Sequence, residues 1–307
     1  MIKRAVSALP VLLWALTVSA WAQPSIDFAF GVIAQPARTN ADAMPLEQAL
    51  AESDADNLAF VAVDGFKRAD EPCGDALYNQ RFALLSGAKN GVILVPAGSD
   101  WSDCRNPSSG RVDGLERLER LRELFYPDEF SLGASKIPLI RQSITPKFRL
   151  YAENTRWDVG SVLFTSLNLP ANNNRYRTDA GRNSEFEDRA VATRDWLRRS
   201  FANAKFKNMA GIVLICDGDP LSKPAKGIQH DGFAEVRQQL TQLAAKFPGK
   251  VLLIHNHVES KGPSAQGIVW RGNLGELELK GGWIKVSVKP NDAALFSVAS
   301  STAQPAS

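Results

Sequence analysis

Short apolar runs alternate with amphipathic stretches along most of the chain, and this alternation restricts the possible folds more than any other feature. Strands that alternate with helices are typical of α/β proteins, in which helices cover the faces of a sheet. The sequence therefore predicts an α/β fold. Eight runs have the length and composition of buried β-strands: residues 26–33, 58–63, 91–95, 162–167, 212–216, 251–255, 268–270 and 283–288.

Three segments between these runs have helical patterns. Leucines recur every three residues from Leu115 to Leu124, which gives one apolar face. Ser184 and Glu187 form a capping-box pattern that predicts the start of a long helix, and a further helix is expected after Asp231. The sequence has no internal repeat and no long linker, so we expect a single domain over residues 23–298 and a loose tail over residues 299–307.

The first 22 residues have the organisation of an export signal. Lys3 and Arg4 precede an apolar stretch, and Ala20-Trp21-Ala22 supplies the small residues that a signal peptidase requires. We therefore expect residues 1–22 to be removed and the protein to be periplasmic or secreted. An uncleaved membrane anchor is the alternative, but the apolar stretch is shorter than the roughly 20 residues of a membrane span. No later stretch is apolar enough to be a transmembrane segment.

The composition is that of a folded globular protein with little net charge. Hydrophobic residues make up 44% of the 307 residues and charged residues 22%, which excludes the disordered, collagen-like and coiled-coil classes. Without Lys3 and Arg4 the chain keeps 34 basic and 33 acidic residues, a formal charge of +1. This balance gives no reason to expect nucleic acid or an anionic membrane as a partner.

Export changes the interpretation of the three cysteines, because disulfides are stable in an oxidising compartment. Cys73 and Cys104 lie in polar, loop-like sequence, and we expect them to form a disulfide. Cys216 lies inside an apolar run and is expected to be buried and free. A nucleophilic Cys216 is the alternative, but neither of the later histidines has a sequence context that makes it a base for this thiol.

Polar side chains follow the predicted strands, at the edge where α/β sheets bind their ligands. Carboxylates, amides and histidines placed this way can converge into a cation or acid–base site. Local turns are an alternative explanation for Asp64 before Gly65 and for the Asp217-Gly-Asp-Pro segment, and His255 can equally be a buried histidine in the core. The residues in question are Gln35, Asp64, Ser99, Asp100, Asn168, Asp217, Asp219, His255, Asn256 and His257.

The order and spacing of several motifs resemble the calcineurin-like metallophosphoesterases, and most closely an exported bacterial branch of that superfamily. The resemblance covers nearly the whole chain after the signal. It implies a four-layer sandwich of two mixed β-sheets flanked by helices, with two metal ions that activate a water for attack on a phosphoester. The segments that carry it are residues 28–33, 60–67, 73–78, 96–104, 114–118, 151–157, 167–174 and 252–255.

This chain departs from the family at the metal-binding motifs. Ala34-Gln35 replaces a Gly-Asp, and Asp64-Gly65 replaces the Gly-Asp whose carboxylate would bridge the metals. Ser99 stands in place of an Asn ligand, and in the late His-Gly-x-x-His motif only His255 keeps its place, with Glu259 in the position of the second histidine. A dinuclear centre with so few of its ligands is expected to bind metal poorly.

Two functions follow from these departures. In the first, the scaffold is a non-catalytic pseudoenzyme with a binding or structural role, no cofactor and an unknown partner. In the second, the chain is an altered phosphoester hydrolase with a single-metal or metal-independent site, in which Asp64, His255 and His257 hold a divalent manganese, iron or zinc ion and His255 and Asp100 are catalytic. The hydrolase hypothesis requires Asp64, Asp100 and His255 to point into one cleft.

Overall fold

The computed structural model describes residues 26–35, 44–106, 110–111, 113–178, 183–223, 227, 229–256 and 267–298. The predicted signal over residues 1–22 and the predicted tail over residues 299–307 lie outside these ranges, as do His257 and Glu259. Within the described part of the chain, no helix has both the length and the apolar character needed to cross a membrane.

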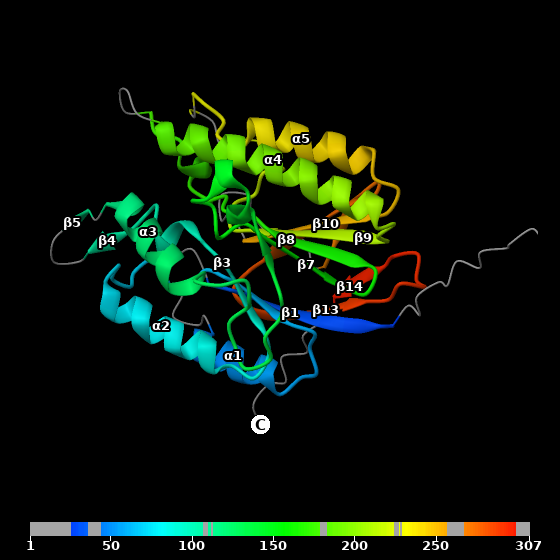
Figure 1. Cartoon of the computed structure of the whole chain (residues 1–307), viewed down its shortest axis with the longest axis horizontal. Coiled ribbons are helices and arrows are strands. Elements are labelled where there is room, and N and C mark those ends of the chain that lie inside the picture. Colours follow the sequence, from blue (N-terminus) through cyan, green and yellow to red (C-terminus); the bar gives the residue numbers. More distant parts are fainter. Residues whose placement is uncertain are drawn as a thin grey trace, which may run out of the picture.

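Two mixed β-sheets form the centre of the structure (Figure 1). The smaller has five strands in the order β14-β13-β1-β2-β3. Strands β1 to β3 are parallel, and β13 and β14 run antiparallel to their neighbours. The bounds are β1 (Phe28–Ala34), β2 (Val61–Asp64), β3 (Val92–Val95), β13 (Gly282–Val288) and β14 (Phe296–Val298).

The larger sheet has seven strands in the order β11-β12-β10-β9-β8-β7-β6. Strands β8, β9, β10 and β12 are parallel, β11 and β7 run antiparallel to their neighbours β12 and β8, and the edge strand β6 is antiparallel to β7. The bounds are β6 (Ile140–Arg141), β7 (Thr155–Val159), β8 (Val162–Ser166), β9 (Gly211–Cys216), β10 (Lys250–Asn256), β11 (Val269–Arg271) and β12 (Leu274–Leu279). A short ladder pairs β4 (Arg105–Asn106) with β5 (Gly110–Arg111).

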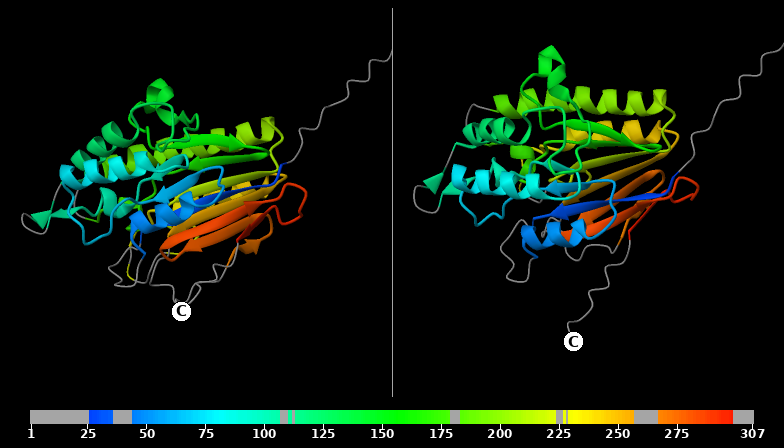
Figure 2. Two further views of the ribbon diagram at one scale, coloured as in Figure 1. Left: turned by 90° about the horizontal axis from the view of Figure 1, so that it is seen from below. Right: turned by 60° about the horizontal axis from the view of Figure 1, so that its bottom comes forward.

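Helices cover the outer face of each sheet, so that the molecule has four layers (Figure 2). Three of them pack on the five-stranded sheet: α1 (Leu46–Asp54), α2 (Asp75–Gly87) and α3 (Gly114–Phe125). The other two pack on the seven-stranded sheet: α4 (Ser184–Phe206) and α5 (Ala234–Ala245). Short 3₁₀ turns lie in the connections: η1 (Gly98–Asp100), η2 (Gln142–Ile144), η3 (Pro146–Phe148) and η4 (Asn173–Arg175).

The core between the sheets is built on four aromatic side chains. The ring of Phe60 lies 5.1 Å from that of Phe30, 4.8 Å from that of Phe164 and 5.2 Å from that of Trp157. Phe30, Phe164 and Trp157 lie in strands of the two sheets and Phe60 directly precedes β2; all four are at most 3% exposed. Burial of their aromatic surface helps to hold the two sheets together.

The structure confirms the predicted α/β class and the two mixed sheets. All eight apolar runs contribute a strand or part of one. The runs that form β2, β3, β8, β9 and β10 are buried on both faces, between the core of the two sheets and a helix layer, whereas β11 and β13 are only partly buried. The predicted capping box is wrong. Helix α4 does begin at Ser184, but the cap residue is Asn183. The Asn183 side chain bonds the backbone of Arg177 and does not cap the helix.

The side chains of β10 alternate between the two faces of the seven-stranded sheet. Leu252 and Ile254 point into the core between the sheets, whereas Leu253 points toward α4 and α5. Since successive side chains of a strand point to opposite faces, His255 lies on the helix-covered face and Asn256 lies toward the space between the sheets. Both side chains are at most 5% exposed.

Candidate functional site

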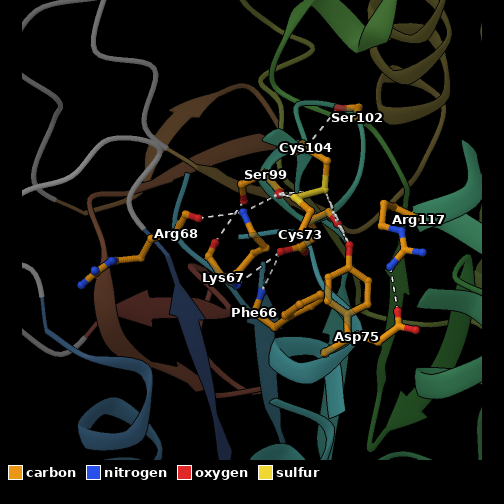
Figure 3. Close-up of a disulfide and its surroundings, with 12 residues drawn as sticks. Phe66, Lys67, Arg68, Cys73, Asp75, Ser99, Ser102, Cys104 and Arg117 are labelled. Carbon is orange, nitrogen blue, oxygen red and sulfur yellow. Dashed lines mark hydrogen bonds and ion pairs between the residues drawn. A yellow bond between two sulfur atoms is a disulfide. The ribbon is translucent and has the colours of Figure 1, made fainter. Parts of the chain in front are cut away.

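A disulfide joins the loops that follow β2 and β3 (Figure 3). Cys73 and Cys104 form it, with their Cα atoms 5.6 Å apart, as their loop context predicted. Lys67, at the start of the first loop, donates from Nζ to the backbone carbonyl of Ser99 in the second loop at 2.9 Å. The two loops are therefore held together covalently and by a buried ammonium group. Cys216 is buried and free, as expected.

Asp100 is the carboxylate that organises these two loops. Its Oδ1 accepts hydrogen bonds from the backbone N–H groups of Phe66 and Lys67 at 3.1 and 3.3 Å, and its Oδ2 accepts one from Ala97 at 2.9 Å. Asp100 is fully buried, and this burial raises its pKa to about 7 even though the three amides favour the ionised form. About one acceptor position of four remains on this carboxylate.

Asp217, directly after β9, has a corresponding role on the other sheet. Its Oδ2 accepts hydrogen bonds from the backbone N–H groups of Gly98 and Ala171, both at 2.7 Å. Its Oδ1 accepts one from Nδ2 of Asn256 at 3.0 Å. Because Gly98 follows a strand of the five-stranded sheet, this carboxylate links the ends of the two sheets. Burial raises the pKa of Asp217.

Asp64, the last residue of β2, has no such partners. It is fully buried, and neither carboxylate oxygen has a hydrogen-bond partner among the described residues. Burial raises its pKa well above the ordinary value, and the charges of Asp217 and Asp100 raise it further. These effects favour the neutral form of the Asp64 carboxyl. We call Asp64, Asp100 and Asp217 the carboxylate cluster.

His255 lies in a separate group of side chains on the helix-covered face of the seven-stranded sheet. Its Nε2 is 3.2 Å from Oε1 of Glu276 on β12 and 3.8 Å from Oδ1 of Asp219 in the loop after β9. Its Nδ1 is 2.8 Å from the backbone carbonyl of Asn256. We call Asp219, His255 and Glu276 the histidine cluster.

The two clusters differ in whether their ligand atoms converge. Among the described residues, the histidine cluster alone brings three His, Cys, Asp or Glu ligand atoms within 4.8 Å of one another. The carboxylate cluster does not meet this criterion, although its members come from the predicted strand ends. A metal ion needs donors that all lie about 2.0 to 2.6 Å from one point, and the histidine cluster comes nearer to this arrangement than the carboxylate cluster does.

The residues predicted from the sequence thus divide between two places. Asp64 and Asp100 lie together in the carboxylate cluster, His255 lies in the histidine cluster, and His257 is outside the described residues. Glu276 was missed, because the strand that carries it was not predicted. The alternation of Leu and Glu in residues 276–279 is the signal that indicates this strand.

No protein-family model matches this chain, and no curated protein matches it.

Proposed function

We propose that this chain is an exported protein with a metallophosphoesterase-type scaffold that has lost the dinuclear metal centre and acts by binding, without catalysis. The observation that carries the proposal is the geometry of the carboxylate cluster, whose ligand atoms do not converge. Two of its three carboxylates instead accept hydrogen bonds that fix the loops. Asp100 accepts three from backbone N–H groups, and Asp217 accepts two from backbone N–H groups and one from the side-chain amide of Asn256.

The state of Asp64 supports the same conclusion. A carboxylate that bridges two metal ions must be ionised. Burial and two neighbouring acids favour the neutral form of Asp64 instead, and a neutral carboxyl is a poor ligand. The fold, the disulfide and the polar ends of the strands remain, so the scaffold is suited to a role in recognition or structure.

The proposal is tested by turnover of bis-p-nitrophenyl phosphate by the signal-free protein with 1 to 2 equivalents of added Mn²⁺, Fe²⁺ or Zn²⁺. We expect no hydrolysis above the rate of the metal alone. The matched control is Asp64→Asn, which removes the one carboxylate free to bridge metals and is expected to leave the background rate unchanged. Metal-dependent turnover that Asp64→Asn abolishes would establish a metal-dependent hydrolase and refute the proposal.

A second candidate function is an altered hydrolase, and the position of His255 between two carboxylates favours it. In that case His255 would be the acid–base group or would hold a single metal ion. Turnover that is lost in His255→Ala would select this candidate over the non-catalytic scaffold, and its survival in Asp64→Asn would show that Asp64 is not a ligand of the metal.

A further inference from the structure

We propose that Asp219, His255 and Glu276 form a mononuclear site for a divalent cation, with Zn²⁺ the best fit. The site lies on the helix-covered face of the seven-stranded sheet, away from the carboxylate cluster. It does not depend on the proposed function, because a single zinc ion at this place is compatible with either a catalytic or a non-catalytic protein.

The first argument is the protonation pattern of His255. Its Nδ1 faces the backbone carbonyl of Asn256 at 2.8 Å. A carbonyl oxygen only accepts hydrogen bonds, so Nδ1 carries a proton and is the donor. Nε2 faces Oε1 of Glu276 and Oδ1 of Asp219. These three ligand atoms lie within 4.8 Å of one another, the convergence that a bound cation requires.

A proton on Nε2 satisfies only part of this arrangement. One N–H group can reach Oε1 of Glu276 at 3.2 Å, but the 3.8 Å separation from Oδ1 of Asp219 is too long for a hydrogen bond. A cation placed among the three atoms reaches all of them. Ligands that lie 2.0 to 2.1 Å from a tetrahedral zinc ion are about 3.4 Å apart, which matches the separations in the histidine cluster.

Each member of the cluster is also held in place by hydrogen bonds to the backbone or to a neighbouring side chain, as metal ligands commonly are. The Nδ1–H group of His255 is held by a backbone carbonyl. Oε2 of Glu276 accepts a hydrogen bond from Nη1 of Arg271 at 2.6 Å, and this bond leaves Oε1 facing His255. Oδ1 of Asp219 accepts the backbone N–H groups of Leu221 and Ser222 at 2.7 and 3.1 Å.

The donor set selects zinc among divalent cations. One imidazole nitrogen with two carboxylate oxygens is a borderline-soft set that suits Zn²⁺ better than Mg²⁺ or Ca²⁺, which prefer oxygen donors alone. Asp219 and His255 are at most 1% exposed. The cation would therefore bind among buried side chains at the end of β10 and not on the open surface.

The test is zinc binding by the full signal-free chain, measured by isothermal titration calorimetry with ZnCl₂ and by elemental analysis after dialysis. We expect one zinc ion per chain, and Glu276→Gln should weaken binding at least tenfold. The matched control is Glu235→Gln, which alters an exposed glutamate on α5 paired with Arg194 and should leave the affinity unchanged. Circular dichroism establishes that each variant is folded. Asp219→Asn is the second variant, should Glu276→Gln fail to fold.

A second readout is the ¹⁵N NMR spectrum of the imidazole of His255. The chain has only two other histidines, His230 and His257, so the signals can be assigned with single variants. We expect Nδ1 to remain protonated and the Nε2 signal to shift to the metal-coordinated position on addition of ZnCl₂. The proposal is overturned if the protein binds no zinc, if Glu276→Gln and Asp219→Asn bind it as tightly as the unmodified protein, or if His255 remains a doubly protonated imidazolium in saturating zinc. None of these results depends on phosphoesterase turnover, so this site and the proposed function fail independently.

Discussion

Removal of the disulfide between Cys73 and Cys104 should destabilise the protein by an amount that the length of the closed loop sets. The bridge joins residues 31 positions apart in the sequence. For a loop of that length, the bridge lowers the conformational entropy of the unfolded chain by about 12 cal/mol/K, which stabilises the folded state by about 3.7 kcal/mol at 25 °C. We therefore expect Cys73→Ala/Cys104→Ala to lower the free energy of unfolding by about 3.7 kcal/mol.

The assay is equilibrium unfolding in urea, followed by tryptophan fluorescence and far-UV circular dichroism, with and without dithiothreitol. Reductant should lower the stability of the unmodified protein to that of the double variant and should leave the double variant unchanged. The double variant keeps Cys216, which is buried and free, so this comparison also controls for effects of reductant on that thiol. A double variant within about 1 kcal/mol of the unmodified protein would refute the loop-entropy reasoning.

Two further predictions concern the buried charges. Burial raises the pKa values of Asp64, Asp100 and Asp217 in the folded state. The folded protein therefore keeps protons that these carboxyls release near pH 4 in the unfolded chain. The free energy of unfolding should fall as the pH rises from about 4 through about 7. Asp64→Asn should make urea unfolding less dependent on pH in this window, and an unchanged pH dependence would contradict the assignment. Glu153 is fully buried and pairs with Arg122 at 2.6 Å, so Arg122→Met should cost about 3 to 5 kcal/mol by leaving an unpaired buried charge. Arg198→Met, at an ion pair whose arginine side chain is 70% exposed and whose Asp195 keeps a second partner in Arg199, should change the stability by about 0.5 kcal/mol or less. Equal costs in the two variants would show that burial of Glu153 does not matter.

The sequence predicted those parts of the fold that depend on continuous burial. A strand such as β9 is buried on both faces, and its uninterrupted apolar run identifies it. Strand β7 was missed because Arg156 and Asp158 alternate with its buried residues, so no apolar run marks it. Helix α2 was missed for a different reason. Arg81 occupies a buried position of its inner face and is neutralised there by Glu47 and Glu71, so a charged residue interrupts the apolar period.

The resemblance to metallophosphoesterases predicted two mixed sheets flanked by helices, and the structure has them. The loop context of Cys73 and Cys104 predicted their disulfide. What sequence order did not predict is which strand-end side chains meet. Asp217 was noted as a strand-end carboxylate, but its part in linking the two sheets depends on Gly98, which is 119 positions away in the sequence.

The separation of the two clusters has a simple geometric cause. A sheet edge brings strand ends together, but each strand still directs successive side chains to opposite faces. His255 and Asn256 are neighbours in sequence, yet Asn256 bonds Asp217 in the carboxylate cluster and His255 contacts Glu276 on the helix-covered face. A shift of one residue exchanges the two faces. The hydrolase hypothesis placed Asp64, Asp100 and His255 in one cleft, which required His255 to have the orientation that Asn256 has. In the structure His255 faces Glu276 instead, and Asn256 holds the position next to Asp217.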